Sequence, residues 1–420
     1  MNPLASDYRA TLTRRGLLAV PALLYAAGDP ELAWFFRAFN RDGAASDAAL
    51  AEIGKSWRDG LAPMLIEYLR IVLHHSNSPV DPRRFVAFLE QRTGQSHGTD
   101  LHAWNRWMWS RPYQPHPKYA EFKGLLYANI DQRMREFFPP GVRSEVRLDQ
   151  VEWGGVEVNG IPPLVNPKTV RASEASYLGN GNVVFGIEIG GEARAYPKRI
   201  LAWHEMARDR IGGAELAIVY CTLCGAVIPW FAASGERRFT LGTSGLLYES
   251  SKLMFDDDTK SLWSTLQGRP VIGALAGSDI QLEFAPVVTT TWREWRESHP
   301  GTTVLAFDTG HDRDYSEGAA YHDYFATDRL MFEVSRHDKR LRNKAEILAI
   351  RLPGKTPLAI SVSRLRKKPD LTIQHEGARI EIATTKAGAS TVMVDGRRIP
   401  AHRAFWFGWY AQFPGARLVE

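Results

Sequence analysis

The stretch LAIVYCTLCGAVIPWF occupies residues 216–231 and decides how the chain around it folds. Two apolar runs, Leu216–Tyr220 and Val227–Phe231, have the length and the β-branched content of buried strands. Between them lies Cys221–Gly225, whose final glycine tolerates a positive φ. The pattern predicts a strand, a tight turn and a second strand, with both cysteine side chains on one side of the turn.

After about residue 147 the sequence keeps the same pattern, in which short β-prone runs are separated by Gly, Asn and Asp. Val183–Ile189 and Glu192–Tyr196 flank Gly190-Gly191, which is the strongest kind of local hairpin signal. Only a few helices are expected here, over residues 199–206, 292–298 and 341–346. We therefore expect residues 147–420 to form a mostly antiparallel β domain with a few helices.

The sequence before this point predicts helices from about residue 10 to 140. Apolar residues recur on one face of a 3.6-residue period at Leu61, Met64, Leu65, Tyr68, Leu69 and Val72. Asp81-Pro82 is a typical helix start. Short helices joined by Gly, Asp and Pro turns favour a solenoid-like stack of antiparallel helical pairs over residues 1–146, although no fixed helical repeat is legible. The expected fold class is α+β.

The composition is that of a globular protein with more than one domain. The chain has 420 residues, of which 44% are apolar and 24% charged. The net charge of +5 is small for this length, and the one dense basic run, 364–368, is interpreted as a solvated loop. We therefore expect no nucleic-acid partner.

The N-terminal sequence bears on where the protein is found. No run of about 20 apolar residues exists, so no transmembrane segment is expected. Arg14-Arg15, followed by the apolar residues 17–27, looks like a twin-arginine export signal, and a core helix is the alternative interpretation. The expected location is cytoplasmic, with export through this N-terminus as the second alternative.

The sequence contains two cysteines, Cys221 and Cys224, which excludes a disulfide-stapled scaffold. Three interpretations of the pair stay open: a redox dithiol, a metal-binding turn, and two buried thiols that serve as small apolar side chains. A thioredoxin-like pair needs the first cysteine at a helix N-terminus, whereas a β-prone run follows here. The metal-binding turn therefore agrees best with the strand-turn-strand context.

A metal site would need ligands beyond the two sulfurs, because there is no third cysteine. His204, on a short predicted helix 17 residues before Cys221, is the first candidate as third ligand or adjacent base, and His322 is the second. Glu205 either orients His204 or is solvated. Cys221, Cys224 and His204 would hold a zinc or copper ion with an open coordination position. This hypothesis predicts an oxidoreductase or a metal-assisted hydrolase that acts on a small molecule.

Two further hypotheses involve no metal. In the first, the protein exchanges thiols and disulfides, with Cys221 as the attacking thiolate, Cys224 as the resolving thiol and His204 as the proton acceptor. In the second, the protein is a non-catalytic binding module whose helical region presents a surface to a protein partner.

Tyr220–Gly225 resembles the Tyr-Cys-Pro-Leu-Cys-Gly signature of a widespread prokaryotic family of domains of unknown function. The resemblance covers roughly residues 147–415 and is carried by Trp153–Val156, Gly160–Leu164, Ala195–Pro197, Trp203–Glu205, Ser244–Ser250, Ser261–Ser264 and Phe405–Phe407. Thr222 replaces the proline of that signature, so the turn loses one φ restraint and keeps its glycine and both sulfurs. The resemblance implies that the cysteine turn and His204 belong to one recurrent set of residues.

Overall fold

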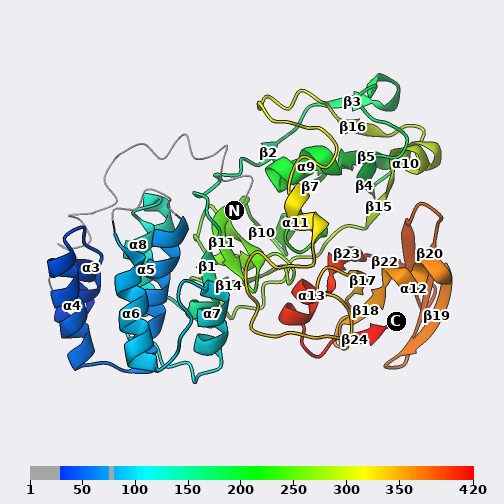
Figure 1. The fold of residues 1–420 in the computed structure, drawn as a ribbon. Coiled ribbons are helices and arrows are strands. Elements are labelled where there is room, and N and C mark those ends of the chain that lie inside the picture. The colour runs from blue at the N-terminus through cyan, green and yellow to red at the C-terminus, as the bar shows by residue number, and fades with distance from the viewer. Residues whose placement is uncertain (1–28, 75–79) are drawn as a thin grey trace.

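The computed structural model describes residues 29–74 and 80–420 of the chain (Figure 1). Helices form the N-terminal part and sheets form most of the remainder, so the α+β class is confirmed. Arg14-Arg15, the core of the predicted export signal, lies outside the described residues. Across the described ranges, no helix combines the length and the apolar character needed to cross a membrane.

The N-terminal helices begin where side chains can cap them. The Asp29 carboxylate accepts a hydrogen bond of 3.1 Å from the Leu32 N–H, and the Asp81 carboxylate accepts one of 3.0 Å from the Arg83 N–H. A proline follows each aspartate at the first helical position, which confirms the predicted start at Asp81-Pro82. The helices are α3 (Pro30–Ala38), α4 (Gly43–Lys55), α5 (Ala62–His74), α6 (Pro82–Thr93), α7 (Leu101–Trp109) and α8 (Tyr119–Tyr127), followed by the 3-10 helix η3 (Gln132–Phe137).

Helix α5 is the centre of the helical part. The predicted apolar stripe is buried at all six of its positions, Leu61, Met64, Leu65, Tyr68, Leu69 and Val72. Helix α5 packs against α6, α7 and α8. Helices α3 and α4 pack against each other, and α4 also contacts α6. The solenoid-like stacking of these helices stays a prediction.

The C-terminal part contains five sheets of four or five strands. In spatial order, the first sheet is β1 (Val151–Trp153), β11 (Leu241–Tyr248), β12 (Ser251–Asp256), β13 (Leu262–Ser264) and β14 (Arg269–Ile272). The second is β2 (Leu164–Val165), β6 (Met206–Ile211), β7 (Ala214–Cys221) and β8 (Ala226–Phe231). The third is β15 (Val287–Thr291), β4 (Val183–Ile189), β5 (Glu192–Pro197), β16 (Thr303–Leu305) and β3 (Thr169–Arg171).

The two remaining large sheets lie nearest the C-terminus. One is β23 (His402–Phe405), β17 (Glu346–Ile350), β18 (Leu358–Ser361) and β24 (Arg417–Val419), and the other is β19 (Asp370–His375), β20 (Ala378–Thr384), β21 (Ser390–Val394) and β22 (Arg397–Ile399). A two-stranded ribbon joins β9 (Ala233–Ser234) to β10 (Arg237–Arg238). Strand pairing in the described chain is antiparallel except for β16–β5, β18–β24 and β2–β6. The prediction of a mostly antiparallel region is confirmed.

The predicted hairpins form where their turn residues require them. Strands β4 and β5 pair through Ile189 and Glu192, and the intervening Gly190 and Gly191 have φ of 57° and 81°. Strands β7 and β8 pair up to Cys221 and Ala226, which places the cysteine turn at the end of that hairpin. Local turn chemistry therefore sets both registers.

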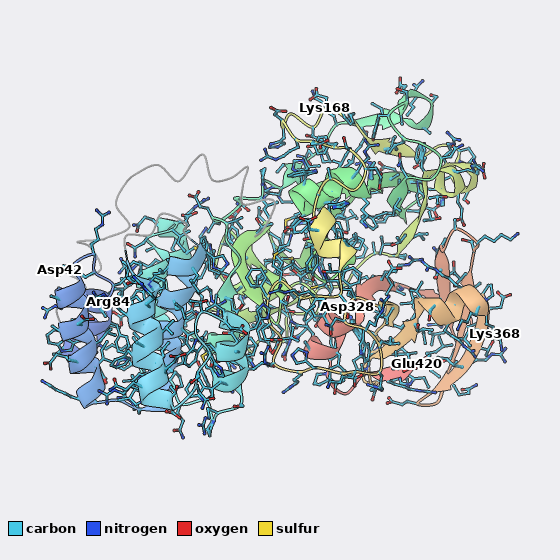
Figure 2. The ribbon with its side chains drawn as sticks, in the orientation of Figure 1. Asp42, Arg84, Lys168, Asp328, Lys368 and Glu420 are labelled. Atoms are coloured by element: carbon cyan, nitrogen blue, oxygen red, sulfur yellow. The ribbon has the colours of Figure 1, made fainter. Side chains whose placement is uncertain are left out.

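The helices between the strands agree only in part with the prediction. Helix α10 spans Trp292–Ser298 as expected, and α9 ends earlier than expected, at His204. The predicted helix over 341–346 is wrong, because the carboxylate of Asp328, labelled in Figure 2, accepts the backbone N–H groups of Asn343 and Lys344 at 3.1 and 2.9 Å. These two N–H groups therefore donate to a side chain and not to the carbonyl groups of a helix.

The basic run 364–368 is also not a loop, because most of it lies in α12 (Val362–Lys367), where Leu365 is buried. The other two helices of the C-terminal part are α11 (His322–Ala326) and α13 (Trp406–Gln412). Helix α13 lies against the cysteine turn, since a Cβ added to Gly408 would be 3.4 Å from the sulfur of Cys224.

Candidate functional site

The cysteine turn holds both sulfurs inside the protein. Cys221 is the last residue of β7, and Gly225, with φ of 60°, returns the chain into β8. Cys221 and Cys224 are 1% and 0% exposed, and their Sγ atoms are 2.7 Å apart. Glycine is required at position 225 for two reasons. Its φ is positive, and a Cβ there would lie 2.9 Å from the ring of Phe405. The expected side-by-side placement of the sulfurs is confirmed.

The two thiols differ in acidity. Burial acts to raise the pKa of Cys221, but the Cys224 thiol, the backbone N–H of Lys252 and the Lys252 ammonium stabilise its thiolate and bring the pKa below the usual value. Burial and the adjacent Cys221 sulfur raise the pKa of Cys224 well above the usual value. Of the two thiols, Cys221 is therefore the more acidic.

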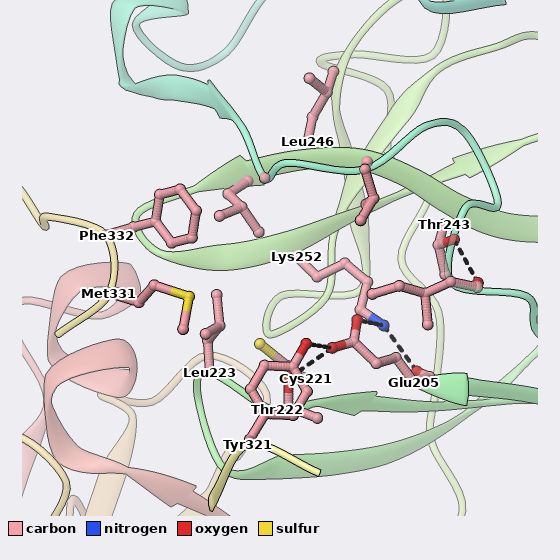
Figure 3. Close-up of a pocket in the computed structure, with 15 residues that line it drawn as sticks. Glu205, Cys221, Thr222, Leu223, Thr243, Leu246, Lys252, Tyr321, Met331 and Phe332 are labelled. Atoms are coloured by element: carbon pink, nitrogen blue, oxygen red, sulfur yellow. Dashed lines mark hydrogen bonds and ion pairs between the residues drawn. The ribbon is translucent and has the colours of Figure 1, made fainter. Parts of the chain in front are cut away.

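Glu205 and Lys252 form a buried ion pair beside Cys221 (Figure 3). The Lys252 Nζ donates to the Glu205 backbone oxygen at 2.8 Å and lies 3.0 Å from Oε2 of the same residue. The other carboxylate oxygen, Oε1, accepts hydrogen bonds from the Thr222 hydroxyl at 2.7 Å and from the Tyr321 hydroxyl. The carboxylate is thus fully partnered, which is the condition for a charge to be tolerated at 6% exposure.

Thr222, the residue that replaces the proline of the signature, gains a function in this network. A proline at position 222 could not donate the hydrogen bond that the Thr222 hydroxyl gives to Glu205. The substitution therefore couples the cysteine turn to the buried ion pair.

His204 makes its hydrogen bonds away from the sulfurs. Its Nδ1 is 2.9 Å from the Pro162 carbonyl oxygen, and its Nε2 is 2.5 Å from the Tyr315 hydroxyl. Burial lowers the pKa of His204 to about 4, so the ring is neutral near pH 7. Both ring nitrogens are used in these contacts, and it is the next residue, Glu205, that reaches the cysteine turn.

The backbone conformation at the end of α9 explains why Glu205, and not His204, reaches the cysteine turn. Glu205 follows the helix in the left-handed region, with φ of 55°, and its side chain leaves the chain in a different direction from that of His204. Among the residues that the structure describes, no three His, Cys, Asp or Glu side chains form a group able to hold a metal ion. The predicted ligand set Cys221, Cys224 and His204 is therefore not assembled there.

The second candidate histidine, His322, is exposed, and its ring contacts Asp323 at 3.2 Å. The residues on either side of it approach the turn instead. The Tyr321 hydroxyl bonds Glu205, and the Tyr324 hydroxyl donates to the Leu223 carbonyl oxygen at 2.9 Å. The sequence therefore indicated the correct segment near the cysteine turn, but the side chains that reach the turn are those of Tyr321 and Tyr324 and not that of His322.

A small cavity opens beside Cys221, with a volume of about 40 Å³. Its polar wall contains Glu205, Cys221, Thr222, Thr243, Lys252 and Tyr321, and its apolar wall includes Leu223, Leu246, Leu247, Met331 and Phe332 (Figure 3). Cys224 is not among the lining residues. Of the two sulfurs, the more acidic one therefore faces the cavity and the less acidic one lies behind it.

Lys252 and Tyr321 were not identified from the sequence. Lys252 is 31 residues after Cys221 and Tyr321 is 100 residues after it, so no spacing motif joins them to the turn. One signal was available: Lys252 is a single charged residue directly before the apolar run Leu253–Phe255. A charged residue in a buried strand calls for a partner.

Comparison with protein families identifies the family to which the chain belongs. The family described as Protein of unknown function (DUF3179) matches residues 158–398. The match is shorter than the resemblance over 147–415, and it includes the cysteine turn, Glu205, Lys252 and Tyr321. No curated protein and no solved structure matches the chain.

Proposed function

Because the chain belongs to the DUF3179 family, whose description assigns no reaction, we propose from its geometry that it is a dithiol–disulfide oxidoreductase. Cys221 is the reacting thiolate and Cys224 is the resolving thiol. Oxidation of the Cys221 thiolate and the Cys224 thiol joins the two sulfurs and releases two electrons and one proton, and reduction reverses this change.

The observation that carries the proposal is the difference between the two sulfurs. Cys221 lines the cavity and has a lowered pKa, whereas Cys224 lies behind it with a raised pKa. Thiol exchange needs this division, because the thiolate is the nucleophile and the second thiol must wait for an intermediate to form. The helix dipole that lowers the pKa of the first cysteine in thioredoxin-like turns is replaced here by the Lys252 ammonium and backbone N–H.

The side chains around the sulfurs favour a redox pair over a shared metal. Among the residues that the structure describes, no third His, Cys, Asp or Glu side chain joins Cys221 and Cys224 in a group that could hold an ion. A zinc site normally takes at least three such protein ligands. The predicted zinc or copper ion therefore does not fit, and we derive no step through it.

Glu205 takes the position that the sequence hypothesis gave to His204. Its carboxylate holds the Lys252 ammonium in place, and that ammonium supports the Cys221 thiolate. Glu205 is thus a positioning residue. The expectation of a protein partner on the helical region stays a prediction, and in the described part of that region Tyr113 is the one large hydrophobic side chain that is exposed.

Equilibration of the purified protein with small redox mediators at a series of fixed potentials tests the proposal. We expect both thiols to disappear together in one two-electron step, with a mass loss of about 2 Da after acid quenching. Cys221→Ser and Cys224→Ser should each abolish this intramolecular step. Retention of both thiols in the native protein at every potential, with disulfide formation only in urea, would contradict the proposal.

A further inference from the structure

The space beside Cys221 limits which oxidants can react there. The two cysteines are 1% and 0% exposed, and the adjoining cavity has a volume of about 40 Å³. One water molecule needs about 10–15 Å³ on this measure, so the cavity accommodates about three non-hydrogen atoms. A cystine in a protein, or glutathione disulfide, carries carbon and peptide groups on both sulfurs and exceeds this space.

A proton donor lies at the same cavity. Two of the three N–H bonds of the Lys252 ammonium point to Glu205, at 2.8 and 3.0 Å. Within residues 29–74 and 80–420, no hydrogen-bond acceptor is seen for the third N–H of this ammonium. Since the backbone N–H of Lys252 also contacts the Cys221 sulfur, β12 places an acid beside the nucleophile at the end of β7.

We infer that the oxidant reduced by this dithiol is hydrogen peroxide, or a hydroperoxide of similar size. The inference rests on the proposed function and adds the substrate class. Peroxide has two non-hydrogen atoms, accepts two electrons in one displacement, and has a leaving group that needs a proton. Dioxygen also fits by size, but it accepts electrons singly from a thiolate.

The reaction balances with groups that the site contains. The Cys221 thiolate attacks one peroxide oxygen, an S–O bond forms, the O–O bond breaks, and the departing hydroxide takes a proton from Lys252 to become water. The Cys224 sulfur then attacks the Cys221 sulfenic acid, an S–S bond forms, and the S–O bond breaks. The proton of Cys224 leaves with that oxygen as a second water. Two small alkyl thiols from solution restore the pair: the first forms an S–S bond with Cys221 and frees the Cys224 thiol, and the second breaks that bond and leaves with the first as a disulfide. Lys252 regains its proton from water.

The apolar wall sets the size limit. Met331 and Phe332 lie on the same side of the cavity as Leu223 (Figure 3). Hydrogen peroxide passes these side chains more easily than a hydroperoxide with an aromatic substituent. One extra methylene group commonly changes rates by about 10- to 200-fold in a hydrophobic pocket.

A single-turnover experiment on the reduced full-length protein tests the inference. Hydrogen peroxide, cumene hydroperoxide and glutathione disulfide are each added at equal concentration, the reaction is quenched with acid, and thiols and mass are measured. We expect hydrogen peroxide to be consumed one-to-one and to form the disulfide at least about tenfold faster than cumene hydroperoxide. Glutathione disulfide should be slower still, and urea-unfolded protein should lose the preference between the two hydroperoxides.

The outcomes separate the two proposals. If cumene hydroperoxide or glutathione disulfide oxidises the native protein as fast as hydrogen peroxide, the substrate class is wrong and the dithiol proposal stands. If no oxidant forms the disulfide in the native protein while unfolded protein is oxidised, the proposed function itself fails.

A matched pair of variants locates the size limit. Met331→Ala should raise the rate with cumene hydroperoxide at least about fivefold and change the rate with hydrogen peroxide little. Leu330→Ala is the control, because Leu330 is buried in a cluster with Val334 and Phe407 and does not line the cavity. An equal effect of both variants would place the limit elsewhere and overturn this assignment.

Discussion

At the scale of single residues, the cysteine pair shows how one neighbour distinguishes two identical side chains. Cys221 and Cys224 are three positions apart and equally buried, so burial by itself would raise both pKa values. Lys252 contributes a backbone N–H and an ammonium to Cys221, and Cys224 supplies a thiol hydrogen. The ionised form is therefore placed on the sulfur that faces the cavity.

The lowered pKa of Cys221 predicts the pH dependence of disulfide formation with hydrogen peroxide. A lowered pKa leaves more thiolate at a given pH, so the rate should reach half of its maximum at a lower pH in the native protein than in urea-unfolded protein, whose thiols titrate near about pH 8.5. Samples quenched with acid at each pH and measured by mass give the rate. A native profile at or above that of the unfolded chain would contradict the assignment of Lys252.

The buried ion pair predicts a large loss of stability in Lys252→Met. Removal of the ammonium leaves the Glu205 carboxylate buried without its cation, which costs about 3–5 kcal/mol of unfolding free energy. The double variant Lys252→Met/Glu205→Gln should recover part of that loss, because the uncompensated charge is also removed. Urea denaturation of the single and double variants measures the difference. Additive losses would show that the two residues do not stabilise one another.

At the scale of elements, two irregular segments build the site on the regular strands. One is the cysteine turn, which depends on a left-handed glycine. The other is the segment 328–337, which supplies Met331 and Phe332 to the cavity. Glu333 fastens that segment to α7 through His102 and Arg106 and also accepts a hydrogen bond of 2.9 Å from His337. Apart from Cys221, which ends β7, neither segment belongs to a helix or strand.

Gly225→Ala should destabilise the protein more than Gly235→Ala. Both glycines have nearly the same φ, 60° and 58°, so the backbone cost of about 1–2 kcal/mol is common to both variants. A Cβ at Gly225 would meet the Phe405 ring at 2.9 Å, whereas a Cβ at Gly235 would have no neighbour within 4 Å. Urea denaturation should show the excess loss for Gly225→Ala. Equal losses would mean that Phe405 moves aside without cost.

The Glu333 cluster predicts a pH window of stability. Burial acts to raise the Glu333 pKa, but hydrogen bonds from His102, His337 and Arg106 bring it below 4.5, and the bond to Glu333 raises the His337 pKa above 6.5. The Glu333 contribution is present above pH 4.5 and is lost as the pH falls through the lowered pKa. The His337 contribution is present below pH 6.5 and is lost as the pH rises through the raised pKa.

The stability difference between the wild-type protein and Glu333→Gln should therefore be largest between about pH 4.5 and 6.5. Chemical denaturation across pH 3–9 measures it, with Glu236→Gln, a change in the exposed ribbon turn, as the control. A difference that does not change with pH would show that these ionisations are not linked to folding.

At the scale of the whole molecule, the helical part and the first sheet form one hydrophobic core. Leu246, Leu253 and Phe255 of β11 and β12 belong to the same buried cluster as the helices. A buried charge network crosses this boundary, because Arg70 of α5 donates to Glu152 of β1 at 2.8 Å and Lys123 of α8 donates to the Val151 carbonyl oxygen at 2.7 Å. The helices therefore support the strands that carry Lys252.

This shared core predicts that helices and sheet unfold together. Far-ultraviolet circular dichroism at a helical wavelength and the accessibility of the cysteine thiols should give coincident urea transitions. Arg70→Met should shift both transitions to lower urea, because it leaves Glu152 buried without its cation. Loss of the helical signal well before the thiols become accessible would contradict this coupling.

Features that depend on neighbouring residues were predictable from the sequence. The Gly190-Gly191 hairpin, the start at Asp81-Pro82 and the turn Cys221–Gly225 all formed as expected, because their causes lie within a few residues. The predicted helix over 341–346 failed because its N–H groups bond to Asp328, at least 15 residues away. No local pattern contains that interaction.

The amino-acid sequence by itself determined that two sulfurs would stand together at the end of a hairpin. Only the tertiary structure decided that Glu205 and not His204 reaches them, and that Lys252 and Tyr321 complete the site. The physical reason is that a left-handed residue at the end of α9 selects which side chain faces the turn, and that strands and loops distant in sequence supply its partners. Electrostatic stabilisation of a buried thiolate depends on distances in space, which spacing along the chain does not define.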